Sequence, residues 1–104
     1  MLSNKFSILV NKKMKEEFLN QVVFSTRFVI KENSPIQVVF HDEDGTWQFF
    51  GPEKKVETED GMILFMKEVI EIDPTIIDAL GVSEGYEARR HAKGSPWIIL
   101  KTKP

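Results

Sequence analysis

Two short runs of charged residues have the types and spacing that could support chemistry. The first is Asp42, Glu43 and Asp44 before Gly45, and closely spaced carboxylates are the ligands that calcium prefers. A calcium loop counted from Asp42 needs glycine at its sixth position, where this sequence has Trp47. Turn chemistry alone explains these residues, because Asp and Gly tolerate the backbone angles of a tight hairpin. We therefore expect a turn and no metal site.

The second run is Arg89, Arg90 and His91. Arginine forks recognise carboxylates and phosphates, so this run could bind an anion or a small acidic ligand. A structural interpretation is equally open if the run lies in a strand. Neighbouring strand residues point to opposite faces, so one arginine would turn inward and need a carboxylate or an aromatic ring as its partner.

The rest of the chain shows no recognisable catalytic or cofactor-binding pattern. His41 and His91 are its only histidines, and neither has zinc-ligand spacing or a nucleophile motif beside it. The six glycines stand singly, without the spacing of a phosphate-binding loop. A hydrolase using His41 with Asp42 or Asp44 is the weakest alternative, because adjacent strand residues rarely converge on one atom. We expect no catalytic residue, no cofactor and no metal, hence no enzyme.

The elements that would position these groups are short strands and short helices. Residues 36–40 and 46–50 form a predicted hairpin around the acidic turn. Residues 66–72 have helical periodicity, and Asp73-Pro74 is a strong helix start, because Asp caps and Pro lacks an N–H that would need a partner. The other predicted strands cover residues 6–10, 86–91 and 96–100, and further helices cover residues 12–19 and 74–80. Residues 22–24 and 27–30 are β-rich in composition.

These elements predict one α+β domain over residues 1–104, with a mainly antiparallel sheet of about five strands and two or three short helices. Periodicity does not decide whether residues 62–65 are a strand or the first turn of a helix. The aromatic side chains expected in the core are Trp47, Phe49, Tyr86 and Trp97.

Composition and charge narrow the class of function. Fourteen basic residues against sixteen acidic ones give a net charge of −2, which argues against a dedicated nucleic-acid binder. The apolar run at residues 62–66 is far too short to cross a bilayer, and the first residues lack the pattern of a secretory signal. The absence of cysteine fits a reducing compartment. We expect a cytoplasmic protein with no nucleic-acid or membrane partner.

Four short patterns, taken in order, resemble a bacterial family of small domains of uncharacterised function. They are His41-Asp42-x-Asp44-Gly45-x-Trp47-Gln48-Phe49, Ile70-x-x-Asp73-Pro74, Gly85-x-x-Ala88-x-Arg90 and Pro96-Trp97, and the similarity spans residues 36–98. That family is grouped among the immunity proteins of polymorphic toxin systems. The resemblance implies a non-enzymatic cytoplasmic protein that blocks a cognate toxin by binding it, and it carries over no catalytic residue.

The favoured hypothesis is therefore a protein-binding domain whose partner is a toxin. The candidate partner contacts are the acidic tip and the basic run, that is, Asp42, Glu43, Asp44, Arg89, Arg90 and His91. The alternative hypothesis is a small-molecule or anion-binding domain that uses the basic run. The sequence leaves the oligomeric state open, and an exposed edge strand could form a dimer.

Overall fold

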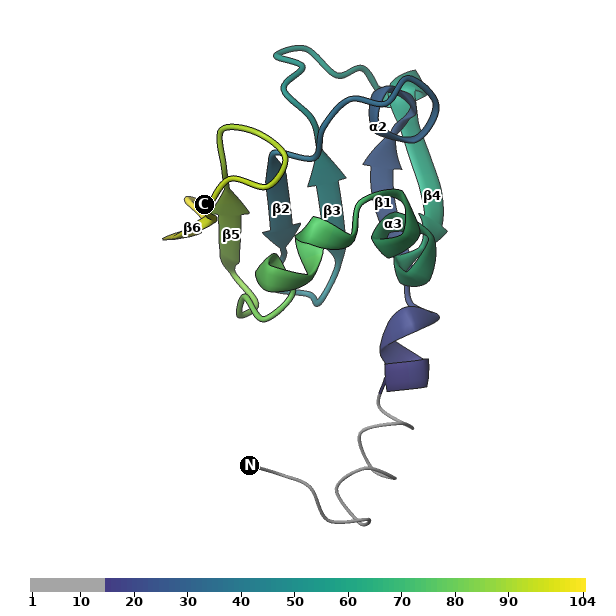
Figure 1. Ribbon diagram of the computed structural model, residues 1–104. Helices are drawn as coiled ribbons and strands as arrows, with labels where there is room; N and C mark the ends of the chain where they lie inside the picture. Colours follow the sequence, from purple (N-terminus) through teal and green to yellow (C-terminus); the bar gives the residue numbers. More distant parts are fainter. Residues whose placement is uncertain (1–14) are drawn as a thin grey trace.

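A six-stranded mixed sheet is the framework of the molecule, with strand order β4-β1-β3-β2-β5-β6 (Figure 1). The structure is a computed structural model that describes residues 15–104. Neighbouring strands are antiparallel except β1 and β3, which are parallel. The strands are β1 (Val22–Thr26), β2 (Val38–His41), β3 (Trp47–Phe50), β4 (Gly61–Phe65), β5 (Tyr86–Arg89) and β6 (Ile98–Lys101).

The helices that connect these strands are short. They are the α-helices α2 (Arg27–Lys31) and α3 (Met66–Ile72) and the 3-10 helices η1 (Thr58–Asp60) and η2 (Pro74–Ala79), and residues 15–19 are also helical. The predicted α+β class is confirmed, although the sheet has six strands rather than about five. The predicted strand at residues 6–10 and the start of the predicted helix at residues 12–19 lie outside the described residues.

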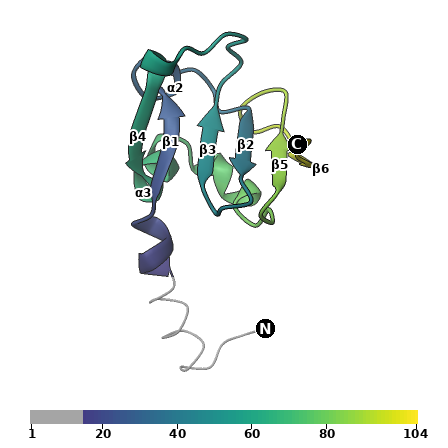
Figure 2. The same cartoon turned by 180° about the vertical axis from the view of Figure 1, so that it is seen from behind.

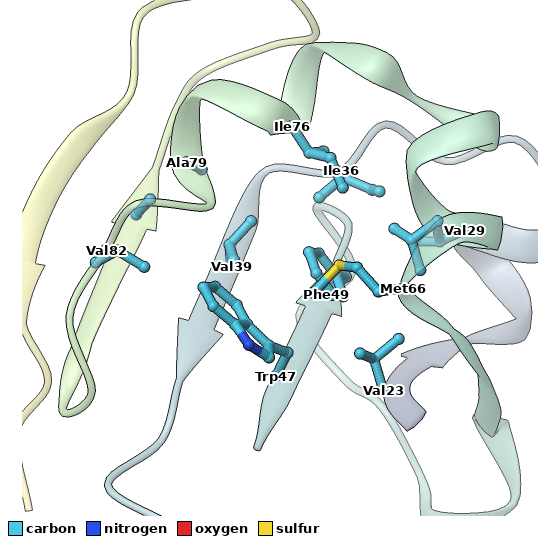
Figure 3. Close-up of a cluster of buried hydrophobic side chains, with 12 residues drawn as sticks. Val23, Val29, Ile36, Val39, Trp47, Phe49, Met66, Ile76, Ala79 and Val82 are labelled. Atoms are coloured by element: carbon cyan, nitrogen blue, oxygen red, sulfur yellow. The ribbon is translucent and has the colours of Figure 1, made fainter. Parts of the chain in front are cut away.

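The hydrophobic core lies between one face of the sheet and the layer formed by α3 and η2 (Figures 1 and 3). The strands contribute the fully buried Val23, Val39 and Phe49, and the helices contribute Met66 and Ile76. Each of these strand residues alternates with a neighbour on the other face of the sheet. The opposite face has no helix over it in the described part of the chain, as the reverse view shows (Figure 2).

The predicted core aromatic residues divide into two groups. Trp47 and Phe49 on β3 are buried, as expected. Trp97 is only half-buried, and Tyr86 is 37% exposed, so its predicted place in the core is wrong. Tyr86 opens β5 and pairs with His41 and Lys101.

Local sequence signals account for several of these elements. Gly45 has a φ of 90°, and its N–H donates to the carbonyl of Asp42 at 2.9 Å, which closes the predicted hairpin turn. The carboxylate of Asp73 accepts a hydrogen bond from the N–H of Thr75 at 3.0 Å and so caps η2 as predicted. Helix α3 has the predicted bounds.

The β-rich composition of residues 27–30 favours a strand, but this segment is the helix α2. The hydroxyl of Thr26 accepts a hydrogen bond from the N–H of Val29, and Arg27 Nε donates to Asp60 at 2.8 Å, with a second ion pair to Glu32. A contact with a residue 33 positions away therefore overrides the β-propensity of this segment. The undecided residues 62–65 belong to β4, which pairs along its length with β1.

The buried carboxylate of Asp60 makes stability depend on pH. Its pKa lies below the ordinary value, first because the N–H of Glu57 donates to it and then because Arg27 does. A carboxyl whose pKa is lower in the folded state stabilises the fold above its unfolded pKa of about 4 and loses that contribution as pH falls through the folded value.

We expect Asp60→Asn to lower the free energy of unfolding near neutral pH and to make it less sensitive to acid. The values for the wild type and the variant should converge as pH falls below the unfolded pKa of about 4 and through the lower folded pKa, because the wild-type carboxyl becomes neutral there. Urea unfolding at a series of pH values measures this, with Glu59→Gln, the exposed neighbour, as the control. A difference that stays constant with pH would contradict the assignment.

Candidate functional site

The acidic turn is held together by its own carboxylates. Asp42 accepts a hydrogen bond from Gln48 Nε2 at 2.6 Å, and Asp44 accepts one from the N–H of Thr46 at 2.9 Å. The N–H of Thr46 lowers the pKa of Asp44. Glu43 lies against Gly85, beside the last residues of the chain. Two of the three predicted contacts thus complete the turn, and among residues 15–104 no cluster of three His, Asp or Glu side chains could hold a metal ion.

The basic run is divided between the two faces of the sheet. The side chain of Arg90 is 1% exposed on the helix-covered side, whereas that of Arg89 is 49% exposed on the open side and pairs with Glu87. His91 lies beyond the end of β5 and is exposed. All three residues border a hollow of about 200 Å³, but the guanidinium of Arg90 is directed away to Asp73. The structure therefore does not join the three side chains into one cationic patch.

Arg90 is the inward-facing arginine of the pair, as expected when two arginines are adjacent in a strand and point to opposite faces. Its guanidinium donates to Asp73 Oδ2 at 2.8 Å, to Thr75 Oγ1 at 2.8 Å and to the carbonyl of Ile36 at 2.9 Å. Its Cζ lies 4.1 Å from the centre of the Trp97 ring, so it has both of the predicted kinds of partner. These contacts tie η2 to β5, and they assign Arg90 to the framework of the fold.

His41 is also engaged within the molecule. Its ring stacks on Trp47, with ring centres 3.8 Å apart and planes inclined by 11°. Its Nδ1 lies 2.8 Å from the carbonyl of Val82, and a carbonyl only accepts, so Nδ1 is the donor. The ring of Phe18 also packs edge-on against Trp47, with ring centres 6.0 Å apart. The ring of His41 is thus oriented by packing, and no carboxylate forms a hydrogen bond with it in the described structure.

The open face of the sheet is the surface that the sequence analysis missed (Figure 2). One row of facing residues crosses all six strands and is polar only in part: Ile63, Phe24, Gln48, Phe40, Glu87 and Leu100. Gln48 and Glu87 interrupt this row in the middle, where Arg89 also lies over the ring of Phe40 at 5.7 Å. The open face therefore has a polar centre and an apolar region at each side.

The larger apolar region, which we name the β1–β4 patch, consists of Val22, Phe24, Ile63 and Phe65. Their exposed fractions are 53%, 40%, 67% and 43%. The strand register places Val22 opposite Phe65 and Phe24 opposite Ile63, so the four side chains are adjacent. A groove of about 340 Å³ runs beside them, lined further by Phe50, Val56 and Glu57. This arrangement is an apolar surface with a concavity next to it.

A sequence signal for this patch exists in the missing alternation of β1 and β4. Residues 22–24 and 62–65 are apolar at successive positions, whereas a strand with one wet face alternates apolar and polar residues. Such strands need cover on both faces. Among residues 15–104, α3 and η2 pack on one face of the sheet, and only the topology shows that the other face of β1 and β4 lacks a helix.

Comparisons with known proteins give no relatives for this chain: no family model, no curated protein and no solved structure matches it. Among residues 15–104, no helix has the length and apolar character needed to cross a membrane. The assignment of a functional site therefore rests on the geometry of the described residues.

We expect Arg90→Met to lower the free energy of unfolding by about 3–5 kcal/mol, because it leaves the carboxylate of Asp73 buried without its cation. The control is Lys55→Met, which breaks the exposed ion pair between Lys55 and Glu57 and should cost less than about 1 kcal/mol. Urea unfolding of the two variants measures the difference. Equal losses would show that Arg90 is not part of the framework.

Proposed function

We propose that this chain is a non-enzymatic protein-binding domain of the cytoplasm, and that its partner docks on the β1–β4 patch. One observation carries the proposal: four adjacent apolar side chains are 40–67% exposed on a sheet face that no helix covers among residues 15–104. Exposed apolar patches with polar surroundings are typical of protein interaction sites. Aromatic anchors such as Phe24 and Phe65 are frequent in the centre of such sites.

The charges around the patch indicate the chemistry of the partner. Three carboxylates against one lysine border the patch: Glu57 lines the groove on one side of Ile63, and Glu68 and Glu71 border a second hollow on the other side. The lysine is Lys67, whose Nζ lies 5.7 Å from the centre of the Phe65 ring. The register places the acidic turn at the same end of the sheet as Val22 and Phe65. A protein surface with an apolar anchor ringed by lysine or arginine would complement this arrangement. Complementary charges of this kind speed association and exclude wrong partners.

An inhibitor that acts by covering a toxin needs a contact surface and no reactive groups. The resemblance to immunity proteins supports a toxin as the partner, and the internal contacts of His41 and Arg90 support a role without catalysis. The absence of cysteine agrees with action in a reducing compartment. The proposed activity is therefore inhibition by binding, with a basic toxin domain as the ligand.

The anion-binding alternative has less support from the geometry. It requires Arg89, Arg90 and His91 to act together, but the Arg90 guanidinium is used internally and Arg89 is paired with Glu87. We expect inorganic phosphate and nucleotides to change the melting temperature of the chain no more than chloride does at the same ionic strength. A ligand that does not bind the folded chain does not stabilise it. A saturable rise that Arg89→Ala abolishes would favour the alternative.

The partner can be identified by capture and then tested as a toxin. Tagged wild-type chain is used to capture proteins from an extract of its native host, and each captured protein is produced alone in a test strain. The expected result is a protein that arrests growth when produced alone and does not when this chain is produced with it. Growth arrest that persists with the chain present would contradict the toxin assignment.

We expect Ile63→Lys to weaken binding of the purified partner by at least about tenfold, because it puts a cation in the centre of the apolar patch. The matched control is Ile77→Lys, since Ile77 is 54% exposed but lies on η2, on the opposite side of the sheet. Titration calorimetry measures both dissociation constants. A loss of affinity with Ile77→Lys but not with Ile63→Lys would place the contact elsewhere.

A further inference from the structure

The strand β6 forms one edge of the sheet. It lies at the opposite end of the sheet from β4, and all four of its residues are exposed, including Ile98 at 56%, Ile99 at 49% and Leu100 at 45%. The other edge differs, because Leu64 of β4 packs against the core. Edge strands with free backbone groups are templates for pairing with another chain, and apolar side chains strengthen that tendency.

The hydrogen-bond pattern shows which backbone groups of β6 face outward. The N–H of Thr102 donates to the carbonyl of Gly85 at 2.9 Å, so alternate residues from Thr102 point toward β5. The N–H and C=O of Ile99 and Lys101 therefore point away from β5, and no strand of residues 15–104 lies on that side. Two donors and two acceptors are thus directed toward the edge of the sheet.

From this geometry we infer that two copies of the chain associate weakly by antiparallel pairing of β6 with β6, about a two-fold axis at Ile99. In this register Ile99 lies opposite Ile99 of the second copy, and the outward N–H and C=O of each form hydrogen bonds with those of the other. Ile98 lies opposite Leu100. Apolar residues then meet apolar residues on both faces of the joined sheet. The inference is independent of the proposed partner site, which lies at the β4 edge.

Side-chain chemistry favours a second copy as the occupant of this edge. Lys101 faces Trp97 of the other copy, so the two copies of Lys101 are about four residues, or about 13 Å, apart along the paired strands. Salt screens the repulsion between two charges beyond about 8 Å, so these lysines do not oppose pairing. On the helix-covered side, Ile99 borders an open hollow of about 420 Å³ with Thr75, Asp78 and Trp97, which has room for the second Ile99. The edge is therefore complementary to itself in both shape and charge.

The contact is short, so the dimer is weak, with a dissociation constant on the order of 10 µM. Sedimentation of the wild type from about 1 µM to about 300 µM should show a reversible change from monomer to dimer over that range. Ile99→Lys should stay monomeric throughout, because it sets two lysines directly opposite each other. Ile77→Lys, a matched exposed isoleucine on η2, should dimerise as the wild type does.

A cross-linking test remains informative if Ile99→Lys does not fold. The chain has no cysteine, so Ile99→Cys introduces a single thiol that faces its own copy at a Cα separation of about 5.5 Å, within disulfide range. Oxidation should give a covalent dimer, whereas Lys101→Cys should cross-link far more slowly. A wild type that is monomeric at every concentration, a dimeric Ile99→Lys, or faster cross-linking of Lys101→Cys would overturn the inference.

Discussion

The guanidinium of Arg90 holds the helix layer against the sheet, and the rest of the structure depends on these contacts. Moving a cation out of water costs several kcal/mol unless its donors are used and its charge is matched. Here Asp73 supplies the charge, Thr75 and the carbonyl of Ile36 accept further hydrogen bonds, and the ring of Trp97 covers the cation. These groups come from the start of η2, the segment before β2 and the loop between β5 and β6. One side chain therefore links segments that are far apart in the sequence.

The position of η2 decides which face of the sheet meets solvent. With η2 held at β5 and α3 following β4, both helices lie on the same face, and the core fills the space between them and the strands (Figure 3). The polar groups at the centre of the open face are Gln48, the buried Glu87 and the half-exposed Arg89 that pairs with Glu87. The apolar regions of this face at β1–β4 and at β6 have no such polar side chains, and both proposed contacts follow from that difference.

The residues of the four short sequence patterns serve the architecture. Asp73, Arg90 and Trp97 meet in one buried cluster, and His41 stacks on Trp47. Gln48 holds the carboxylate of Asp42 across the hairpin turn. The proposed contacts, among them Ile63 and Ile99, belong to none of these patterns. Patterns of this kind indicate how a chain folds, and the proposed contact surfaces lie outside them.

The sequence by itself determined the features that depend on neighbouring residues. The turn at Gly45, the cap at Asp73 and the helix α3 arise from backbone angles and hydrogen bonds within a few positions, so local patterns predict them. The argument that adjacent strand arginines face opposite ways also needs only the period of a strand, and Arg89 and Arg90 confirm it.

Tertiary structure alone decided the rest. Segment 27–31 is a helix, in spite of its β-rich composition, with its first residue bonded to Asp60, 33 positions away. The assignment of residues 62–65 to a strand needed β1 as a partner. The candidate sites depended most on the fold. The sequence pattern of an apolar strand residue is the same whether its side chain packs under a helix or is exposed to water. Within residues 15–104, topology put the helices over one face of the sheet and so left Val22, Phe24, Ile63 and Phe65 exposed.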